Sequence, residues 1–121
     1  NVFQNVHKHL RKNGFFIFDM NTKEHVTISS QKPKVKTKVQ NKDVIINHSG
    51  NNNIWRLDMI IKSNNSKVKE THLERGYSSD EIIDISERLG FDVLEVLDEY
   101  KVYWDKNEYL SRQYYVLRKH L

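Results

Sequence analysis

The stretch from Asn13 to Asn21 constrains the fold more than any other part of this sequence. It contains four large apolar residues in a row, Phe15-Phe16-Ile17-Phe18, with no polar residue between them. A strand with one face in water would carry a polar side chain at every second position, so this run predicts a short strand covered on both faces. Such cover is typical of an interior strand in an α/β sheet, where helices pack on both sides.

Asp19 and Asn21 stand where the apolar run ends. In an open α/β sheet, ligands bind in the crevice beyond the carboxyl ends of the strands. We therefore expect residues 19–21 to point at such a crevice, and Asp19 and Asn21 to be candidates for contacting a ligand.

The length of 121 residues suits a single domain. Only 37% of the residues are hydrophobic, which is low for a chain with a strand that needs cover on both faces. The absence of cysteine excludes disulfides, thiolate metal sites and cysteine nucleophiles, and fits a cytoplasmic location. No apolar run is long enough to span a membrane and no secretory leader is visible, so we expect no membrane partner.

Basic residues are concentrated in the first third of the chain, where residues 1–42 hold nine Lys and Arg against two Asp and Glu. Alternation of lysine with apolar residues is typical of the solvent face of an amphipathic strand. We interpret the lysine series as a solvated strand edge, with a phosphate-binding stripe as the alternative. Its members are Lys32, Lys34, Lys36, Lys38 and Lys42.

Two helices are predicted. The first has apolar residues at helical spacing from Val2 to Leu10 and a stop at Asn13-Gly14; because no cap precedes it, we expect upstream residues to be missing. In the second, Ser78 and Glu81 form a capping box and Gly90 ends the helix, whose apolar face is Ile82, Ile83, Ile85 and Leu89.

The remaining chain predicts strands, turns and loops. Antiparallel strands are expected at Lys34–Val39, Val44–Ile46, Ile54–Ile61 and Lys67–His72, then further strands at Phe91–Tyr100 and Arg112–Lys119. Loops are expected at Asn21–Gln31 and Asn47–Asn53 and over 101–111, and a tight turn with asparagines at positive φ at Ser63–Ser66.

The six histidines do not predict a metal site. His7 and His9 are two apart on a helix and cannot chelate together, while His25, His48 and His120 have no neighbouring ligands in the sequence. His72 is different, because Glu74, Arg75 and Tyr77 follow within six residues. These four groups could orient a polar substrate or serve in acid–base chemistry, or Glu74 and Arg75 could form structural ion pairs.

Trp55 shares one face of its predicted strand with Leu57 and Met59. It is either a core residue or part of a pocket wall. Elsewhere the sequence contains no glycine-rich phosphate loop, no nucleophile elbow and no nucleotide fingerprint.

Several of these segments, taken in order, resemble class I S-adenosylmethionine-dependent methyltransferases. Leu10 to Asp19 is similar to their "L-K-x-G-G, strand, D" segment, and Tyr77 to Val93 to their "Y-S, E-E-I, helix, G-F-x-V" stretch. His72 to Tyr77 resembles the "H-x-E-R-x-Y" that ends an antiparallel insertion in small bacterial members, and Ser111 to Lys119 the closing strand.

The resemblance implies an α/β fold: the C-terminal portion of a Rossmann-like methyltransferase sheet with an antiparallel β insertion. Residues 1–32 would supply a helix and the core strand, residues 33–76 the insertion on the substrate side, and residues 77–121 a helix and the antiparallel closing strands. The family builds its cofactor site from its first half, so no cofactor-binding residue carries over to this chain. The complete parent would use S-adenosylmethionine, and the chain alone would be inactive.

The same resemblance implies a parent that transfers a methyl group to a small acceptor. Substrate-binding candidates are Asp19, Asn21, Trp55, Glu74, Arg75 and Tyr77, and His72 is the candidate base. The uncovered strand predicts a partner, either the missing N-terminal half or a second copy of the chain. The alternatives are a self-contained α+β module that binds nucleic acid or an acidic protein through its basic strand, and a remnant that keeps the fold without binding cofactor.

Overall fold

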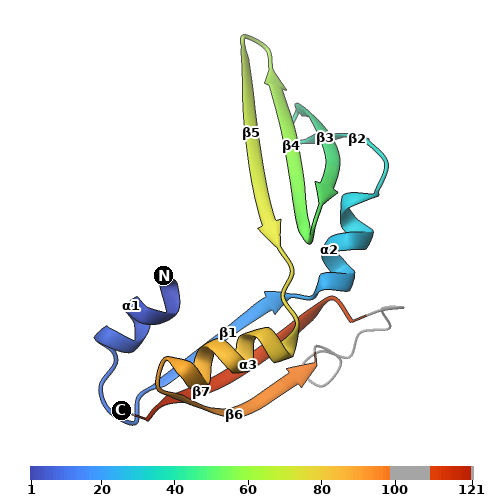
Figure 1. Cartoon of the computed structure of the whole chain (residues 1–121). Helices are drawn as coiled ribbons and strands as arrows, with labels where there is room; N and C mark the ends of the chain where they lie inside the picture. The colour runs from blue at the N-terminus through green and yellow to red at the C-terminus, as the bar shows by residue number, and fades with distance from the viewer. Residues whose placement is uncertain (99–109, 121) are drawn as a thin grey trace. The chain divides into compact units, whose positions relative to one another are not determined.

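The structure, a computed structural model, describes residues 1–98 and 110–120. The chain forms two compact units, and each is described by itself (Figure 1). Unit 1 joins Asn1–Thr22 to Tyr77–Leu121, and unit 2 is Lys23–Gly76. No helix in the described ranges has both the length and the apolarity needed to cross a membrane.

Unit 1 contains a three-stranded sheet in the order β1-β7-β6. The strands are β1 (Phe15–Asn21), β6 (Phe91–Asp98) and β7 (Arg112–Lys119). Because β7 is antiparallel to both of its neighbours, β1 and β6 are parallel to each other. The sequence predicted all three strands; residues 99 and 100, and most of the expected connection over 101–111, lie outside the described residues.

Two helices, α1 (Val2–His9) and α3 (Ser79–Arg88), belong to this unit (Figure 1). The predicted capping box of α3 is confirmed, since Ser78 Oγ accepts from Glu81 N–H and the Glu81 carboxylate accepts from Ser78 N–H. The first helix is capped by Asn1 itself, a cap that the sequence analysis did not assign. Asn1 Oδ1 accepts from the N–H of Phe3 at 2.8 Å, which satisfies a donor that the first turn leaves free.

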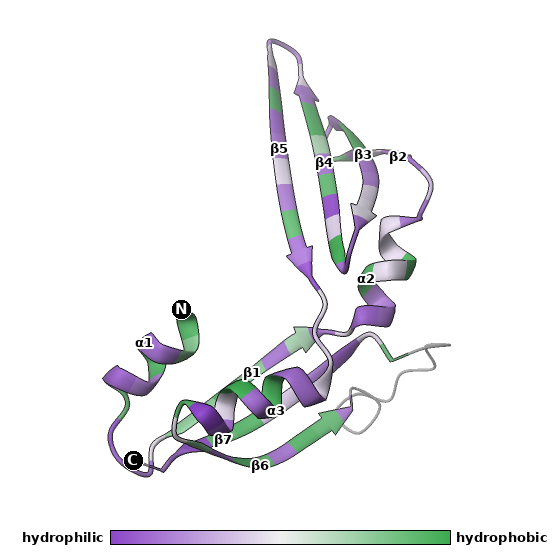
Figure 2. Ribbon diagram, viewed as in Figure 1, coloured by the Kyte–Doolittle hydropathy of each residue, from purple (hydrophilic) through white to green (hydrophobic). Residues whose placement is uncertain are grey.

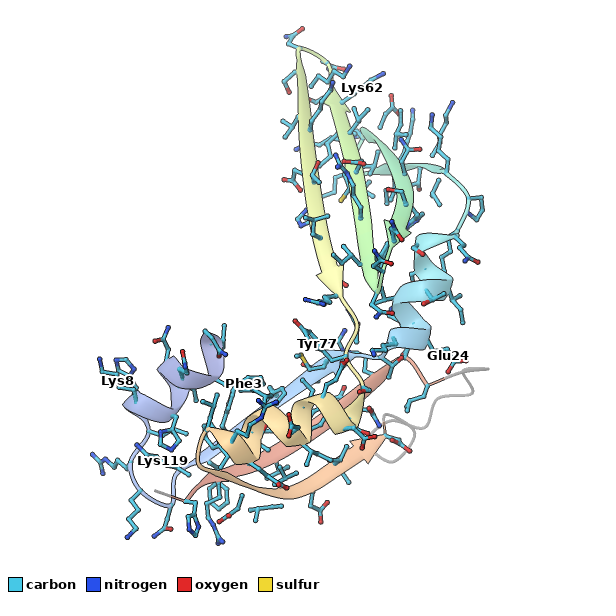
Figure 3. The ribbon with its side chains drawn as sticks, in the orientation of Figure 1. Phe3, Lys8, Glu24, Lys62, Tyr77 and Lys119 are labelled. Atoms are coloured by element: carbon cyan, nitrogen blue, oxygen red, sulfur yellow. The ribbon has the colours of Figure 1, made fainter. Side chains whose placement is uncertain are left out.

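The end of α1 is attached to the sheet by a lysine. Lys119 Nζ donates to the carbonyl oxygens of His7 at 2.6 Å and Leu10 at 2.9 Å (Figure 3). The last carbonyls of a helix lack internal partners and form its negative end, so a cation stabilises them.

The core of unit 1 lies on one face of the sheet. Its buried members are Ile82, Phe91, Tyr115 and Leu117. Phe16 and Phe18 of β1 pack against this cluster, and Phe3 of α1 contacts both phenylalanine rings.

The first strand is not covered on both faces. Phe15 is 58% exposed and Ile17 is 66% exposed, while Phe16 and Phe18, which point to the other face, are half-buried. The strand itself was predicted correctly, but the prediction of an interior strand covered on both faces was wrong, because within the described residues β1 is an edge strand with one covered face. The uniformly apolar sequence therefore marks a second face that nothing in the described chain occupies.

Unit 2 is a four-stranded antiparallel sheet in the order β2-β3-β4-β5. The strands are β2 (Val35–Val39), β3 (Lys42–Asn51), β4 (Ile54–Ser63) and β5 (Ser66–Arg75). Two lysines of the series, Lys36 and Lys38, lie on β2, an exposed edge strand, as the solvated-edge interpretation predicts, while Lys32 and Lys34 precede it. Lys42 departs from the series, because it begins β3 and pairs with Val39, on the face opposite Lys36 and Lys38.

The turns of unit 2 differ from the prediction. Residues 47–53 do not form a long loop, because β3 runs on to Asn51 and only Asn52 and Asn53, at φ 53° and 65°, make the turn. The second pair of neighbouring residues at positive φ is Gln40–Asn41. The asparagines between Ser63 and Ser66 are not at positive φ. A two-residue turn with both φ values positive matches the twist of a hairpin, which lets the flanking strands extend.

The predicted loop over residues 21–31 was also wrong, because Lys23–Ser30 forms the helix α2. Its sequence is rich in β-branched residues and serine, which have low helix propensity, and it shows no clear apolar stripe. Packing on β3 and β4 overrides that local preference, and Val26 and Ser29 are fully buried. The helix therefore belongs with the insertion unit, which starts at Lys23.

Gly50 allows α2 to approach β3 closely. A Cβ added at Gly50 would lie 2.5 Å from Ser30 Cβ and would also collide with the carbonyl oxygen of Ile54. We expect Gly50→Ala to lower the free energy of unfolding of unit 2 by about 1–3 kcal/mol, the usual effect of overpacking. Amide hydrogen exchange over α2 and β3 measures this. Ser49→Ala, at the exposed neighbouring position, is the control, and equal exchange in both variants would contradict the close packing.

Candidate functional site

The carboxyl ends of β1 and β6 lie at the same edge of the unit 1 sheet, because the two strands are parallel. An arginine joins the polar residues at the end of β1. Arg112 Nε donates to Asp19 Oδ2 at 2.6 Å, and its Nη1 donates to Asn21 Oδ1 at 2.7 Å. We call Asp19, Asn21 and Arg112 the edge cluster.

Strand alternation places the edge cluster on the face of the sheet opposite the core. Asn21 pairs directly with Arg112, and Asp19 is two residues from Ile17, so all share the face of the exposed Ile17. The side chains of Asp19 and Arg112 are 40% and 39% exposed. The cluster therefore offers a carboxylate and a guanidinium with access to solvent, groups suited to binding polar parts of a ligand.

The sequence predicted Asp19 and Asn21 but missed Arg112. Arg112 lies 93 residues from Asp19 in the chain, and their hydrogen bond depends on the β1–β7 register. The only local indication was a basic residue at the start of a predicted strand. Tyr77, also predicted, adjoins the cluster through its backbone, whose N–H donates to the Asn21 carbonyl at 3.3 Å, while its side chain packs against the core.

A second polar group lies on the core face at the same edge. Tyr115 Oη donates to Gln113 Oε1 at 3.4 Å, and Gln113 Nε2 donates to Asp98 Oδ1 at 3.1 Å. Burial raises the pKa of Tyr115 to about 12, with a smaller contribution from the negative charge of Asp98. The phenol thus stays neutral and serves as a hydrogen-bond donor at physiological pH.

The raised pKa of Tyr115 predicts a pH effect on stability. In the unfolded chain the phenol ionises near its ordinary pKa of 10.0, below its value of about 12 in the folded chain. Its contribution to the free energy of unfolding is therefore complete below pH 10 and is lost as the pH rises through 12. Ultraviolet absorbance of tyrosinate measures the titration. We expect Tyr115→Phe to remove the ionisation step near pH 12 and the control Tyr114→Phe to keep it. Ionisation of every tyrosine near pH 10 would contradict the raised pKa of Tyr115.

In unit 2 an indole is held between two imidazoles. Trp55 Nε1 donates to His48 Nδ1 at 3.1 Å, and the two rings stack with centroids 5.8 Å apart. His25 of α2 meets the same indole edge-on, also at 5.8 Å. The expectation that His25 and His48 lie in loops was wrong, because one is on a helix and the other inside β3. Since the indole can only donate, His48 carries its hydrogen on Nε2.

The register brings two further predicted residues to the face of Trp55. Glu74 pairs with Trp55 across β4 and β5, and His72 is two residues away on the same face. His72 Nε2 lies 3.1 Å from Glu70 Oε2, and both side chains are about half exposed. Arg75 falls on the opposite face, opposite Ile54. Trp55, His72 and Glu74 thus share one surface of unit 2, and Arg75 does not.

The described residues do not fit a cofactor or a metal. They contain no group of three or more His, Asp or Glu side chains that could hold a metal ion. None of their glycines, at positions 14, 50, 76 and 90, directly follows the carboxyl end of β1 or β6, where a nucleotide-binding loop would be expected. An open depression of about 450 Å³ near Gly90 and His120 lies at the opposite, amino end of β6.

Solved structures similar to this chain include methyltransferases. A S-adenosylmethionine-dependent methyltransferase from Clostridium acetobutylicum ATCC 824 matches with a TM-score of 0.76 and 16% identity, over 98% of this chain and 50% of that one. The CcbJ methyltransferase from Streptomyces caelestis matches with a TM-score of 0.67 and 10% identity, over 97% and 51%. CalS10, an amino pentose methyltransferase from Micromonospora echinaspora with bound SAM, matches with a TM-score of 0.55 and 8% identity. The match covers 97% of this chain and 48% of CalS10.

These similarities show the fold, and the predicted α/β class with an antiparallel insertion is confirmed. The chain spans about half the length of the solved structures that it matches. The sequence matches no protein-family model and no curated protein.

Proposed function

We propose that this chain is the C-terminal part of a S-adenosylmethionine-dependent methyltransferase whose complete form methylates a small acceptor. The observation that carries the proposal is the fold match, which covers 98% of this chain but 50% of the solved methyltransferase. The core strand and the two closing strands named by the sequence resemblance lie in one sheet, in the order β1-β7-β6. The remaining half of the fold would be supplied by residues outside this chain or by a partner.

The cofactor would be held outside the described residues. S-adenosylmethionine, when bound to the parent, supplies a methyl group on a positively charged sulfur. Among the described residues we find no nucleotide cradle, so we assign their contribution to the acceptor. Acceleration of such a transfer comes mainly from holding the acceptor in position, with a base where a proton must leave.

Two groups of residues are proposed as separate candidates for contacting the acceptor, and each is described within its own unit. In unit 1 the edge cluster offers the Asp19 carboxylate, the Asn21 amide and the Arg112 guanidinium. In unit 2 Trp55 offers an aromatic surface held by His48, beside Glu74 and His72. His72 is proposed as the base, because Glu70 can only accept from its Nε2, which leaves Nδ1 to take a proton.

The alternative of a nucleic-acid or acidic-protein module receives less support. Its basic strand, β2, lies at a sheet edge, where lysines prevent strand pairing. Lys38 of that strand is within 3.9 Å of Asp43, which reduces the local positive charge. The fold match to methyltransferases that include an amino pentose methyltransferase favours a small-molecule acceptor.

A transfer assay tests the proposal. A polypeptide that contains this chain and its upstream half is incubated with a metabolite extract and S-adenosylmethionine labelled on the methyl group. We expect label in the small-molecule fraction, and none when the 121-residue chain is used alone. Label found only in nucleic acid or protein would contradict the small acceptor, and no transfer would contradict the proposed function.

A further inference from the structure

We propose that the free edge of β1 and the exposed face of unit 1 form a single interface, and that the remaining half of the methyltransferase fold occupies it. This inference rests on the proposed function and names the surface through which the parent is completed. Two independent features of unit 1 support it, the composition of its edge strand and the exposure of its second face.

The first feature is an unprotected sheet edge. Within the described residues, β1 pairs with β7 alone, so along Phe15–Asp19 the other edge of the strand has no neighbouring strand. An apolar free edge is a template for pairing with another strand, and proteins usually block it with charges, proline or bulges. The first four residues of β1 are Phe-Phe-Ile-Phe, and the strand contains no lysine, proline or bulge.

The other edge strands of the two sheets are protected. In unit 2, β2 carries Lys36 and Lys38, and the opposite edge strand, β5, carries Lys67 and Lys69. In unit 1, β6 is interrupted by an irregularity between residues 93 and 95. The chain thus blocks three edges and leaves the fourth, β1, open to pairing.

The second feature is the face of unit 1 opposite its core. Phe15 is 58% exposed and Ile17 is 66% exposed on this face, and Leu94 of β6 is 41% exposed. Val116 pairs with Ile17 and continues the apolar surface onto β7 (Figure 2). Sheets with parallel strands are normally covered on both faces, and here α1 and α3 pack on the core side. The exposed face therefore fits a further layer of helix.

The length of the matched structures identifies the occupant. This chain matches about half of each solved methyltransferase, so the unmatched half of each is about as long as the matched half. A half-fold of that size supplies both a strand for the edge of β1 and a helix for the adjoining face. A second copy of this chain offers the same exposed strand but has no uncommitted helix among its described elements. We therefore assign the surface to the other half of the fold.

This assembly would also complete the edge cluster. Asp19, Asn21 and Arg112 lie on the face that carries Ile17, so a layer that covers Ile17 adjoins them. Removing water from a carboxylate and a guanidinium strengthens their interactions with a bound polar group. The edge cluster would thus become an enclosed site only when both halves are present.

The experiment uses two separately produced polypeptides, this chain and the stretch encoded immediately upstream of Asn1. Analytical ultracentrifugation at micromolar concentration measures association of the chain alone and of the mixture. We expect a monomer alone and a one-to-one complex in the mixture. Ile17→Lys should weaken the complex by about thirtyfold or more, the effect of losing an interface hot spot. The matched control is Leu73→Lys in unit 2, because Leu73 is also 66% exposed, and it should leave affinity unchanged.

Three results would overturn the inference: a dimer of the chain alone that Ile17→Lys dissociates, no complex in the mixture, or a complex that Ile17→Lys leaves intact. Hydrogen exchange of the β7 amides verifies that each variant remains folded. These readouts do not depend on methyl transfer. A complex that requires Ile17 but binds no S-adenosylhomocysteine would support the interface and reject the proposed function. A complex that binds S-adenosylhomocysteine but tolerates Ile17→Lys would support the proposed function and reject the interface.

Discussion

Replacing Leu117 with alanine should lower the free energy of unfolding of unit 1 by about 2–5 kcal/mol, the cost of removing a buried leucine side chain and leaving a cavity. Leu117 is 0% exposed and lies in the central strand of the β1-β7-β6 sheet. It belongs to the buried cluster with Tyr115, Phe91 and Ile82, so neighbouring strands and α3 all lose contacts. Amide hydrogen exchange over β7 measures the change within unit 1.

The control for this substitution is Leu94→Ala in β6. Leu94 is 41% exposed on the opposite face, and truncation of a surface side chain usually changes stability by less than about 0.5 kcal/mol. We therefore expect a difference of several kilocalories per mole between two leucine truncations in one sheet. Equal effects at the two positions would show that the core does not lie on the face assigned to it.

Replacing His72 with glutamine should slow methyl transfer by the complete enzyme by about 10²–10⁴-fold, the range supplied by a positioned general base. Glutamine can still hydrogen-bond to Glu70 but cannot take a proton at neutral pH. Binding of S-adenosylhomocysteine should be unchanged, because no described residue of unit 2 fits a cofactor site. The assay is the labelled methyl transfer described above, compared across pH.

A second histidine provides a matched control for His72. His120 Nδ1 lies 3.2 Å from Asp92 Oδ2 with its side chain 61% exposed, compared with 3.1 Å from Glu70 and 54% for His72. His120→Gln should leave the rate of transfer unchanged. If both variants retain full activity, His72 is not the base; if both lose it equally, the effect is not specific to the proposed site.

The elements predicted best from sequence are those fixed by local chemistry. The capping box at Ser78 and Glu81 and the positive φ of Gly90 define α3, and both are visible in a few adjacent residues. The last strand, Arg112–Lys119, was also predicted with its correct bounds. Each of these features needs no knowledge of a distant contact.

The errors occurred where tertiary contacts decide the structure. Val26 and Ser29 give α2 a buried side only because β3 and β4 lie against it. The histidines around Trp55 are distant in sequence, and antiparallel register brings His48 to its side. The run Phe15–Phe18 predicted a strand covered on both faces, and this was wrong, because the described chain covers only the face of Phe16 and Phe18.

The candidate site was predicted in part for the same reason. Asp19 and Asn21 were identifiable because they end an apolar strand, a position that depends on local sequence. Arg112, which donates to both, could not be assigned to them without the strand order. Strand alternation also separates Arg75 from His72 and Glu74, although all three are close in sequence.

Calorimetric titration with S-adenosylhomocysteine tests the central claim most directly, because it needs no knowledge of the acceptor. It is applied to the 121-residue chain and to the same chain joined to its upstream half. The account predicts no binding to the chain alone and one molecule bound to the joined polypeptide. Stoichiometric binding to the chain alone, or no binding to the joined polypeptide, would contradict it.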